Sequence, residues 1–212
     1  MKPDRRRTHT RIVRLTHWVA AAAMLCMIGS GWQIYNASPI LPFTFPPWAT
    51  LGGWLAGGIA WHFAAMWVLM AAGLVYLAHG FASGHFRRDI RPQGVRRTAQ
   101  DFALALRLRL HHRAGAYNAV QRLFYTGVLV VATLAVLSGL AIWKPVQLGW
   151  LSWLLGGYDV ARRIHFAMMA LIVAFLIVHL TLVAIVPSTL VGMITGGRRV
   201  PDSDRTQPRI QP

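Results

Sequence analysis

Acidic side chains are almost absent from this 212-residue chain. It contains no glutamate, and its six aspartates fall in tails and connecting segments rather than in the long apolar stretches. Proton relays and transport sites that use histidine within a membrane usually add aspartate or glutamate. The sequence therefore offers little support for a site of that kind.

Cysteine is equally scarce, because the chain has only Cys26. A single cysteine cannot form an intramolecular disulfide. No Cys-x-x-Cys-His motif is present, which excludes covalent attachment of a c-type haem. Cys26 lies within an apolar stretch, where we expect it to act as a small packing residue.

Hydrophobic residues make up 55% of the chain and charged residues only 13%. Crossing a hydrocarbon layer of about 30 Å takes roughly 20 helical residues. In a bilayer each segment must satisfy its own backbone, so such runs should be helices, and the alternating pattern of a barrel strand is absent. The sequence predicts an all-α integral membrane protein, a four-transmembrane-helix bundle whose helices cover about 14–35, 54–79, 118–143 and 160–186.

The distribution of the 22 Lys and Arg residues predicts the orientation of this bundle. The start of the chain up to Arg14 holds six, the connection from Arg87 to Arg122 holds nine, and the segment after Pro187 holds four. By the positive-inside rule, both termini and the middle connection are cytoplasmic. We expect a basic tail at 1–13, a membrane domain at 14–197 with a basic cytoplasmic connection at 80–117, and a second tail at 198–212.

Two other interpretations of the same features are less consistent with the sequence. Nucleic-acid binding would also suit a net charge of +16, but the basic residues flank apolar spans and do not form one basic domain. A secretory signal would also begin with a basic segment and an apolar run. The run from Val19 to Trp32 lacks a clear small-x-small cleavage site, so we interpret it as a retained first helix.

Four histidines lie within the apolar segments. His165 and His179 are fourteen residues apart in the last one, which is about 21 Å along a helix and within about 40° of the same face. His62 lies toward the outer end of the second helix, and His17 lies toward the inner end of the first. Because successive helices alternate in direction, we expect an outer pair, His62 and His165, and an inner pair, His17 and His179.

Two levels with two imidazoles each match the needs of six-coordinate haem iron, which takes one axial nitrogen on each face of the macrocycle. A zinc site would need three or four ligands at one level. For any one of these histidines, ordinary packing is the competing interpretation. His79 follows His62 by seventeen residues and is rotated by about 100° from it, so we expect an interfacial role. The others are expected to be solvated: His9, His85, His111 and His112.

The order and spacing of His17, His62, His165 and His179 in four spans resembles the di-haem cytochrome b subunits of bacterial nickel hydrogenases, formate dehydrogenases and thiosulfate reductases. Bacterial cytochrome b561 is a relative of these subunits. The run Tyr117-Asn118-Ala119-Val120-Gln121 is similar to the Tyr-Asn-Ala-x-Gln segment of the formate dehydrogenase subunits. The resemblance covers roughly residues 10 to 197.

The resemblance implies two non-covalent b haems, held by the outer and inner histidine pairs, in a bacterial inner (plasma) membrane. It also implies electron transfer between quinone and a periplasmic redox partner such as a metalloenzyme subunit or a cytochrome. Asn118 matches an asparagine that helps to bind quinone, and Gln121 lies one turn further along on a similar face. The competing interpretation of both residues is capping and hydrogen bonding at the membrane interface.

Several supporting residues follow from physical arguments. Arg162 and Arg163 precede His165 by one turn or less, where a cation could pair with a haem propionate. Arg11 and Arg14 could serve the inner haem in the same way, although topology alone explains their charge. Small residues could let the outer macrocycle approach the backbone, or they could simply pack helices. These small residues are Gly29, Gly31 and Gly139.

Two alternative functions remain open at this level. One is a stand-alone oxidoreductase of the cytochrome b561 type, for example between superoxide and quinone. The other is a haem-free membrane transporter or assembly protein. Tryptophans near the outer interface are expected to form an aromatic belt.

Overall fold

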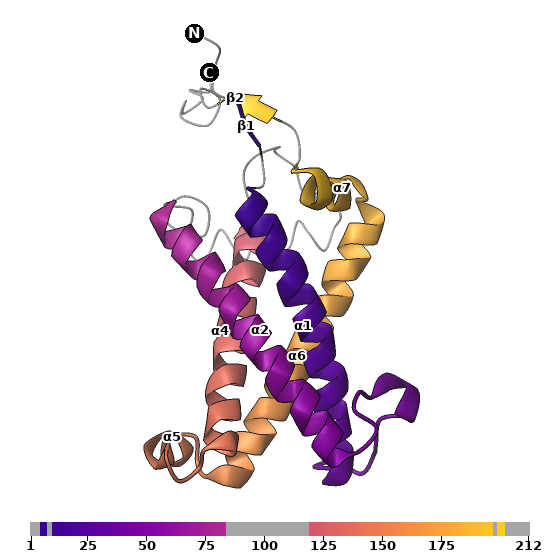
Figure 1. Cartoon of the computed structure of the whole chain (residues 1–212), viewed down its shortest axis with the longest axis vertical. Coiled ribbons are helices and arrows are strands. Elements are labelled where there is room, and N and C mark those ends of the chain that lie inside the picture. The colour runs from indigo at the N-terminus through magenta and orange to yellow at the C-terminus, as the bar shows by residue number, and fades with distance from the viewer. Residues whose placement is uncertain (1–4, 8–9, 84–118, 197–198, 202–212) are drawn as a thin grey trace. The chain divides into compact units, whose positions relative to one another are not determined.

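A computed structural model describes residues 5–7, 10–83, 119–196 and 199–201 of the chain. Its four long helices are α1 (Arg11–Ala37), α2 (Leu55–Ala82), α4 (Ala119–Trp143) and α6 (Tyr158–Ile185) (Figure 1). Each is long and apolar enough to cross a membrane, α4 over Thr126–Trp143. The predicted all-α membrane fold is confirmed, and each helix end lies within three residues of its predicted position.

Five short elements were not predicted. They are the 3-10 helix η1 (Pro47–Ala49), the helices α5 (Gly149–Leu154) and α7 (Ser188–Thr195), and the strands β1 (Arg5–Arg7) and β2 (Arg199–Pro201). The two strands pair antiparallel, with Arg6 opposite Val200. Elements of three to eight residues carry too little periodicity to be recognised in a sequence.

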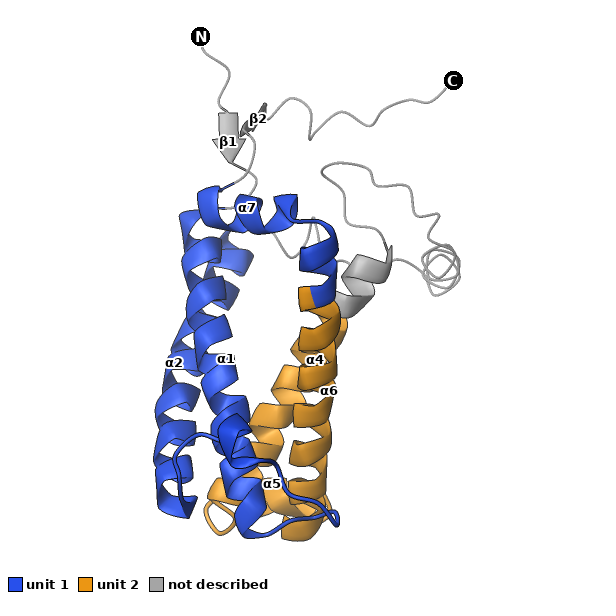
Figure 2. Ribbon diagram, turned by 90° about the vertical axis from the view of Figure 1, so that its right-hand side faces the viewer, with its two compact units in different colours: residues 1–83, 181–212 blue, residues 84–180 orange. Residues whose placement is uncertain are grey.

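The chain divides into two compact units, one of residues 1–83 and 181–212 and the other of residues 84–180 (Figure 2). In the first unit, α1 packs against α2 through small residues. A Cβ added to Gly58 would lie 2.9 Å from the Gln33 side chain, so only glycine fits there. Ala23, Ala65 and Ala72 are also buried. Small residues of this kind let membrane helices approach closely.

The proline-rich loop between α1 and α2 has a fixed structure. The side-chain amide of Asn36 donates to the carbonyl of Phe45 and accepts from its N–H, both at 2.8 Å. The Tyr35 hydroxyl bonds both backbone groups of Leu41 at 3.2 Å. The Trp32 ring stacks on the Phe45 ring with centroids 4.4 Å apart. The loop therefore folds back onto the last turns of α1.

Two contacts join elements at the other end of this unit. The Arg14 guanidinium donates to the carbonyl of Met193, at 3.2 Å, and to the carbonyl of Ile194, both in the last turn of α7. A cation at this position complements the negative end of the helix dipole. His79, at the end of α2, bonds the Thr10 hydroxyl through Nε2 at 3.2 Å. Thr10 is also the N-cap of α1, so this bond ties the two helix ends together.

The second unit packs α5 against the ends of its two long helices. Leu151 of α5 is buried in one cluster with Ala141 of α4 and Ala161 of α6.

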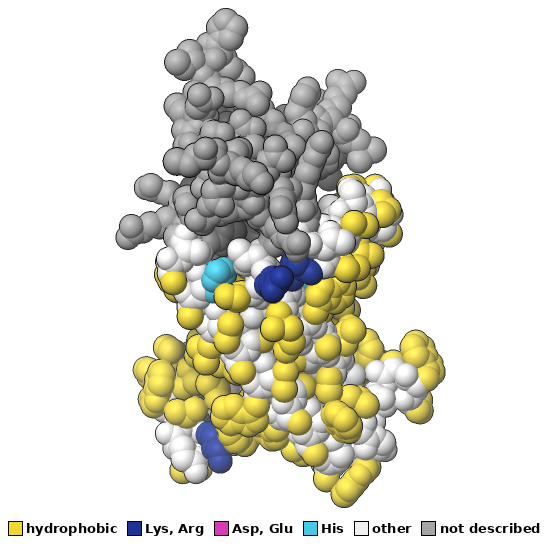
Figure 3. Space-filling view, turned by 45° about the horizontal axis from the view of Figure 1, so that its top comes forward, with side chains coloured by type: hydrophobic (Ala, Val, Ile, Leu, Met, Phe, Trp, Pro, Cys, Tyr) yellow, Lys and Arg dark blue, Asp and Glu magenta, His cyan; other side chains and the backbone are white. Residues whose placement is uncertain are grey.

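Hydrophobic side chains dominate the visible surface of the described residues (Figure 3). Six exposed tryptophans match the residues expected in an aromatic belt: Trp48, Trp54, Trp61, Trp143, Trp150 and Trp153.

Candidate haem site

The four intramembrane histidines lie at matching depths within their own helices. His62 is seven residues after the first residue of α2, and His165 is seven residues after the first residue of α6. His17 is six residues after the start of α1, and His179 is six residues before the end of α6. Because α1 begins at Arg11, it is long enough to place His17 about as far from its helix end as His179.

The His62 ring rests against α1. Its Nδ1 lies 3.1 Å from the Oγ of Ser30, a residue with no exposed surface. The Ser30 hydroxyl also lies 2.6 Å from the carbonyl oxygen of Cys26, four residues earlier in the same helix. A carbonyl can only accept, so this short bond uses the hydroxyl proton, and Ser30 accepts from Nδ1–H of His62.

The His165 ring rests against α4 in the same way. Its Nδ1 lies 3.2 Å from the Oγ of Ser138, which is also completely buried, and donates to the carbonyl of Ala135 at 2.9 Å. The Ser138 hydroxyl donates to the carbonyl of Leu134 at 2.7 Å. Each ring therefore contacts a buried serine, and the hydroxyl of that serine donates a hydrogen bond to the carbonyl four residues before it.

These bonds define the protonation of both rings. With the proton on Nδ1, a neutral imidazole carries its lone pair on Nε2. A histidine that binds a metal usually donates its other ring N–H to a carbonyl or similar acceptor, which fixes the tautomer and the ring orientation. The Nδ1 contacts of His62 and His165 therefore match those usual for a metal-binding histidine.

A glycine follows each serine and faces the same ring. A Cβ added to Gly139 would lie 3.1 Å from Cε1 of His165, and a Cβ added to Gly31 would lie 3.5 Å from Cε1 of His62. Two of the three glycines singled out in the sequence thus border a histidine ring. The third, Gly29, packs under the loop, since an added Cβ would lie 3.3 Å from the Leu51 side chain.

His17 and His179 make aromatic contacts. The His17 ring lies edge-on to Trp18, with centroids 5.4 Å apart. The His179 ring stacks on Phe175, one turn earlier in α6, with centroids 5.8 Å apart and planes 12° apart. Both histidines are half-buried.

The remaining predicted residues have different positions. Arg162 is half-buried in the first turns of α6, and Arg163 is exposed. Asn118 lies outside the described residues, and Gln121 lies in a turn of α4 for which only the backbone is described. Arg14 bonds the end of α7, so the structure gives it a structural role that the sequence did not indicate.

Several other sequence predictions can now be placed. His79 contacts Thr10 through Nε2, and the interfacial role expected for it stays a prediction. The other histidines, expected to be solvated, lie outside the described residues: His9, His85, His111 and His112.

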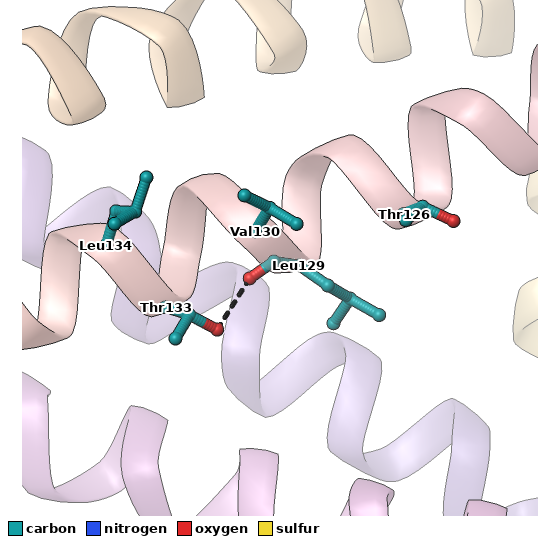
Figure 4. Close-up of a pocket in the computed structure, with 5 residues that line it drawn as sticks. All are labelled: Thr126, Leu129, Val130, Thr133 and Leu134. Atoms are coloured by element: carbon teal, nitrogen blue, oxygen red, sulfur yellow. Dashed lines mark hydrogen bonds between the residues drawn. The ribbon is translucent and has the colours of Figure 1, made fainter.

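An apolar groove of about 300 Å³ runs along α4 (Figure 4). The residues that line it are spaced by three and four, so they form one helix face: Thr126, Leu129, Val130, Thr133 and Leu134. The Thr133 hydroxyl bonds the Leu129 carbonyl at 2.8 Å, which satisfies it within the helix. Leu134, at one end of the groove, also accepts from the Ser138 hydroxyl through its carbonyl.

Sequence reasoning missed Ser30 and Ser138. The signal that could have found them is the Ser-Gly dipeptide that appears in both α1 and α4. Each of these helices precedes a helix that carries His62 or His165. The histidine that each serine contacts lies on another helix, so the sequence alone does not indicate the contact.

Four membrane helices, three of which carry histidines, and two imidazoles with the Nδ1 contacts usual for a metal-binding histidine are the features expected of a membrane haem protein. The chain belongs to the prokaryotic cytochrome b561 family, whose sequence profile matches residues 8–196. The resemblance to di-haem cytochromes b is thereby confirmed at the level of the family, and b-type haem is its cofactor.

A protein of Azospira oryzae is 46% identical to this chain over 189 residues, which cover 89% of this chain and 96% of the relative. Its name marks it as a provisional protein-methionine-sulfoxide reductase subunit, YedZ1. No solved structure matches the chain.

Proposed function

We propose that this chain is a di-haem b-type cytochrome of a bacterial inner membrane, which transfers electrons between quinone and a redox partner on the periplasmic side. The observation that carries the proposal is the pair of matched contacts at His62 and His165. Each ring donates from Nδ1 and lies at the same depth in its own helix.

In this proposal His62 and His165 hold the outer haem, and His17 and His179 hold the inner one. When bound, b-type haem supplies one-electron transfer between ferric and ferrous iron. The chain's own residues orient the rings, exclude water with an apolar surround, and separate two ligand levels by about 21 Å along α6. Small residues next to the His62 and His165 rings leave room beside the backbone.

Quinone would bind near the cytoplasmic end of the bundle, close to Asn118 and Gln121. This placement follows from the resemblance of the segment around Asn118 to the formate dehydrogenase subunits and from the cytoplasmic position of both termini expected from the charge distribution. Protons released or taken up by quinone at this end could exchange with the cytoplasm.

The name of the Azospira oryzae relative suggests the chemistry of the partner, a protein that reduces methionine sulfoxide. Reducing a sulfoxide to a thioether takes two electrons and two protons and releases the oxygen as water. Oxidising a quinol to a quinone releases two electrons and two protons, so the balance closes. Electrons would therefore run from quinol, through this chain, to the partner.

The proposal is tested on the purified full chain. A pyridine haemochrome assay should give two b haems per chain, and a redox titration should give two midpoints. Quinol added to the oxidised protein should reduce both haems. A colourless preparation would contradict the proposal and support a transporter or assembly protein.

Reduction of the haems by superoxide, with transfer to added quinone and no partner present, would instead support the stand-alone oxidoreductase. In that case electrons would enter at the outer face. Both functions can be tested on the same purified protein, because only the proposed function requires electrons to pass from the haems to an oxidised partner protein.

The two arginines before His165 give a matched pair of variants. Arg162 is three residues from His165 and lies on a neighbouring helix face, whereas Arg163 is two residues away and is rotated by about 200°. If Arg162 holds an outer propionate, Arg162→Gln should weaken retention of that haem about tenfold, since hydrogen bonds to charged groups contribute about 1.5–3 kcal/mol. Its midpoint should also fall.

Arg163→Gln is the control and should change neither quantity appreciably. Haem transfer to an excess of apomyoglobin measures retention, and a redox titration measures the midpoint. Equal effects of the two substitutions would show that only the general charge of this helix end matters.

A further inference from the structure

We propose that Ser30 and Ser138 are positioning residues that set the orientation and donor strength of the His62 and His165 imidazoles. Through these rings they tune the midpoint potential of the haem that the two histidines hold. The inference rests on the proposed function for its assignment of His62 and His165 as the ligands of one haem.

The first argument is that the same construction occurs twice. On α1 the order is Ser30 then Gly31, and the serine meets Nδ1 of His62 at 3.1 Å. On α4 the order is Ser138 then Gly139, and the serine meets Nδ1 of His165 at 3.2 Å. These helices belong to different compact units, so one local fold does not explain both contacts.

The second argument concerns burial. Ser30 and Ser138 are the two polar residues with no exposed surface among those that the structure describes. Each hydroxyl donates to its own helix, at 2.6 Å to Cys26 and at 2.7 Å to Leu134. Each hydroxyl keeps lone pairs that can accept from Nδ1–H of a histidine, and at His165 the Ala135 carbonyl, at 2.9 Å, shares this proton with Ser138. Alanine would pack in a similar volume and is the better helix former, so packing alone does not require a hydroxyl.

The effect on the haem follows from ligand basicity. An acceptor on Nδ1–H increases electron density at Nε2 and makes the imidazole a stronger donor. A stronger donor stabilises ferric iron relative to ferrous iron, which lowers the midpoint potential. Removing the acceptor should therefore raise the midpoint and also loosen the ring.

The second ligand level provides an internal reference. Ser30 and Ser138 contact rings at the His62 and His165 level, about 21 Å along α6 from His179. A change at either serine should therefore affect one haem of the two. Substitutions that disturb the whole bundle would affect both.

The experiment compares Ser30→Ala and Ser138→Ala with Ser30→Thr and Ser138→Thr, which keep a hydroxyl. Ser152→Ala, at a buried serine of α5, is the matched control. Each variant is purified as the full chain with its haems. Redox titration gives the two midpoints, apomyoglobin capture gives haem retention, and electron paramagnetic resonance of the ferric form reports the orientation of the imidazole planes.

Each alanine variant should raise one midpoint, change the resonance of the same haem, and weaken its retention by about 10- to 100-fold. Ser138→Ala should lie at the lower end of this range, because the Ala135 carbonyl still accepts from His165. The threonine variants should resemble the unchanged protein, and Ser152→Ala should leave both midpoints in place.

Two unchanged midpoints in an alanine variant that keeps both haems would overturn the inference, as would a shift confined to the other haem. If an alanine variant does not assemble, Ser30→Cys and Ser138→Cys take its place, since a thiol is a weaker acceptor of similar size. An unshifted midpoint in the cysteine variants would overturn the inference equally. An unchanged chain that binds fewer than two haems would instead contradict the proposed function.

Discussion

Replacing His62 or His165 by alanine is expected to lower the haem content from two per chain to one, and both substitutions should remove the same haem. The reason is that the proposed site would keep one histidine instead of two, which weakens its hold on the haem. Replacing His17 or His179 should remove the other haem. Pyridine haemochrome assays and redox titrations of the four single variants measure which midpoint disappears.

His79→Ala is the control for these variants. Its Nε2 bonds the Thr10 hydroxyl at 3.2 Å, so we expect the variant to keep both haems and to lose only this link between α1 and α2. Loss of the same haem from His17→Ala and His62→Ala would disprove the pairing. Loss of a haem from His79→Ala would show that His79 is a ligand.

Gly139→Ala is expected to weaken retention of the His62–His165 haem by at least about tenfold, whereas Gly31→Ala should have little effect. The new Cβ would lie 3.1 Å from Cε1 of His165, closer than normal contact, but 3.5 Å from Cε1 of His62. To relieve the first contact the His165 ring must move by a few tenths of an ångström. Cofactor sites need ligands held within about 0.5 Å of the productive geometry.

The direction of this effect separates it from helix stability. Alanine stabilises a helix by about 1 kcal/mol relative to glycine, so both substitutions should favour the helices themselves. Haem transfer to apomyoglobin, measured beside thermal unfolding, distinguishes the two contributions. Equal haem retention in the two variants would mean that other atoms move to relieve the close contact at Gly139 and that the His165 ring stays in place.

The sequence was sufficient to predict the four helices and the position of each histidine within its own helix. Long apolar runs bounded by charge, proline or glycine set helix ends to within three residues, and helix geometry placed His165 and His179 on one face. These features are local, so they depend little on how the helices pack.

The contacts that depend on packing could not be predicted. Ser30 and Ser138 gain their role only when a histidine of another helix lies against them. Arg14 has the charge expected of a cytoplasmic flank, yet its partners are carbonyls some 180 residues later. Asn36 holds the loop in place by bonding the backbone of Phe45, and no sequence pattern indicates this bond.

The division of the chain into two compact units has a consequence for biogenesis. His17 and His62 belong to the first unit, and His165 and His179 belong to the second. Under the proposed pairing, each haem would take one histidine from each unit. Haem insertion would then be completed only after both units have been synthesised, and cells starved of iron should accumulate the chain without haem.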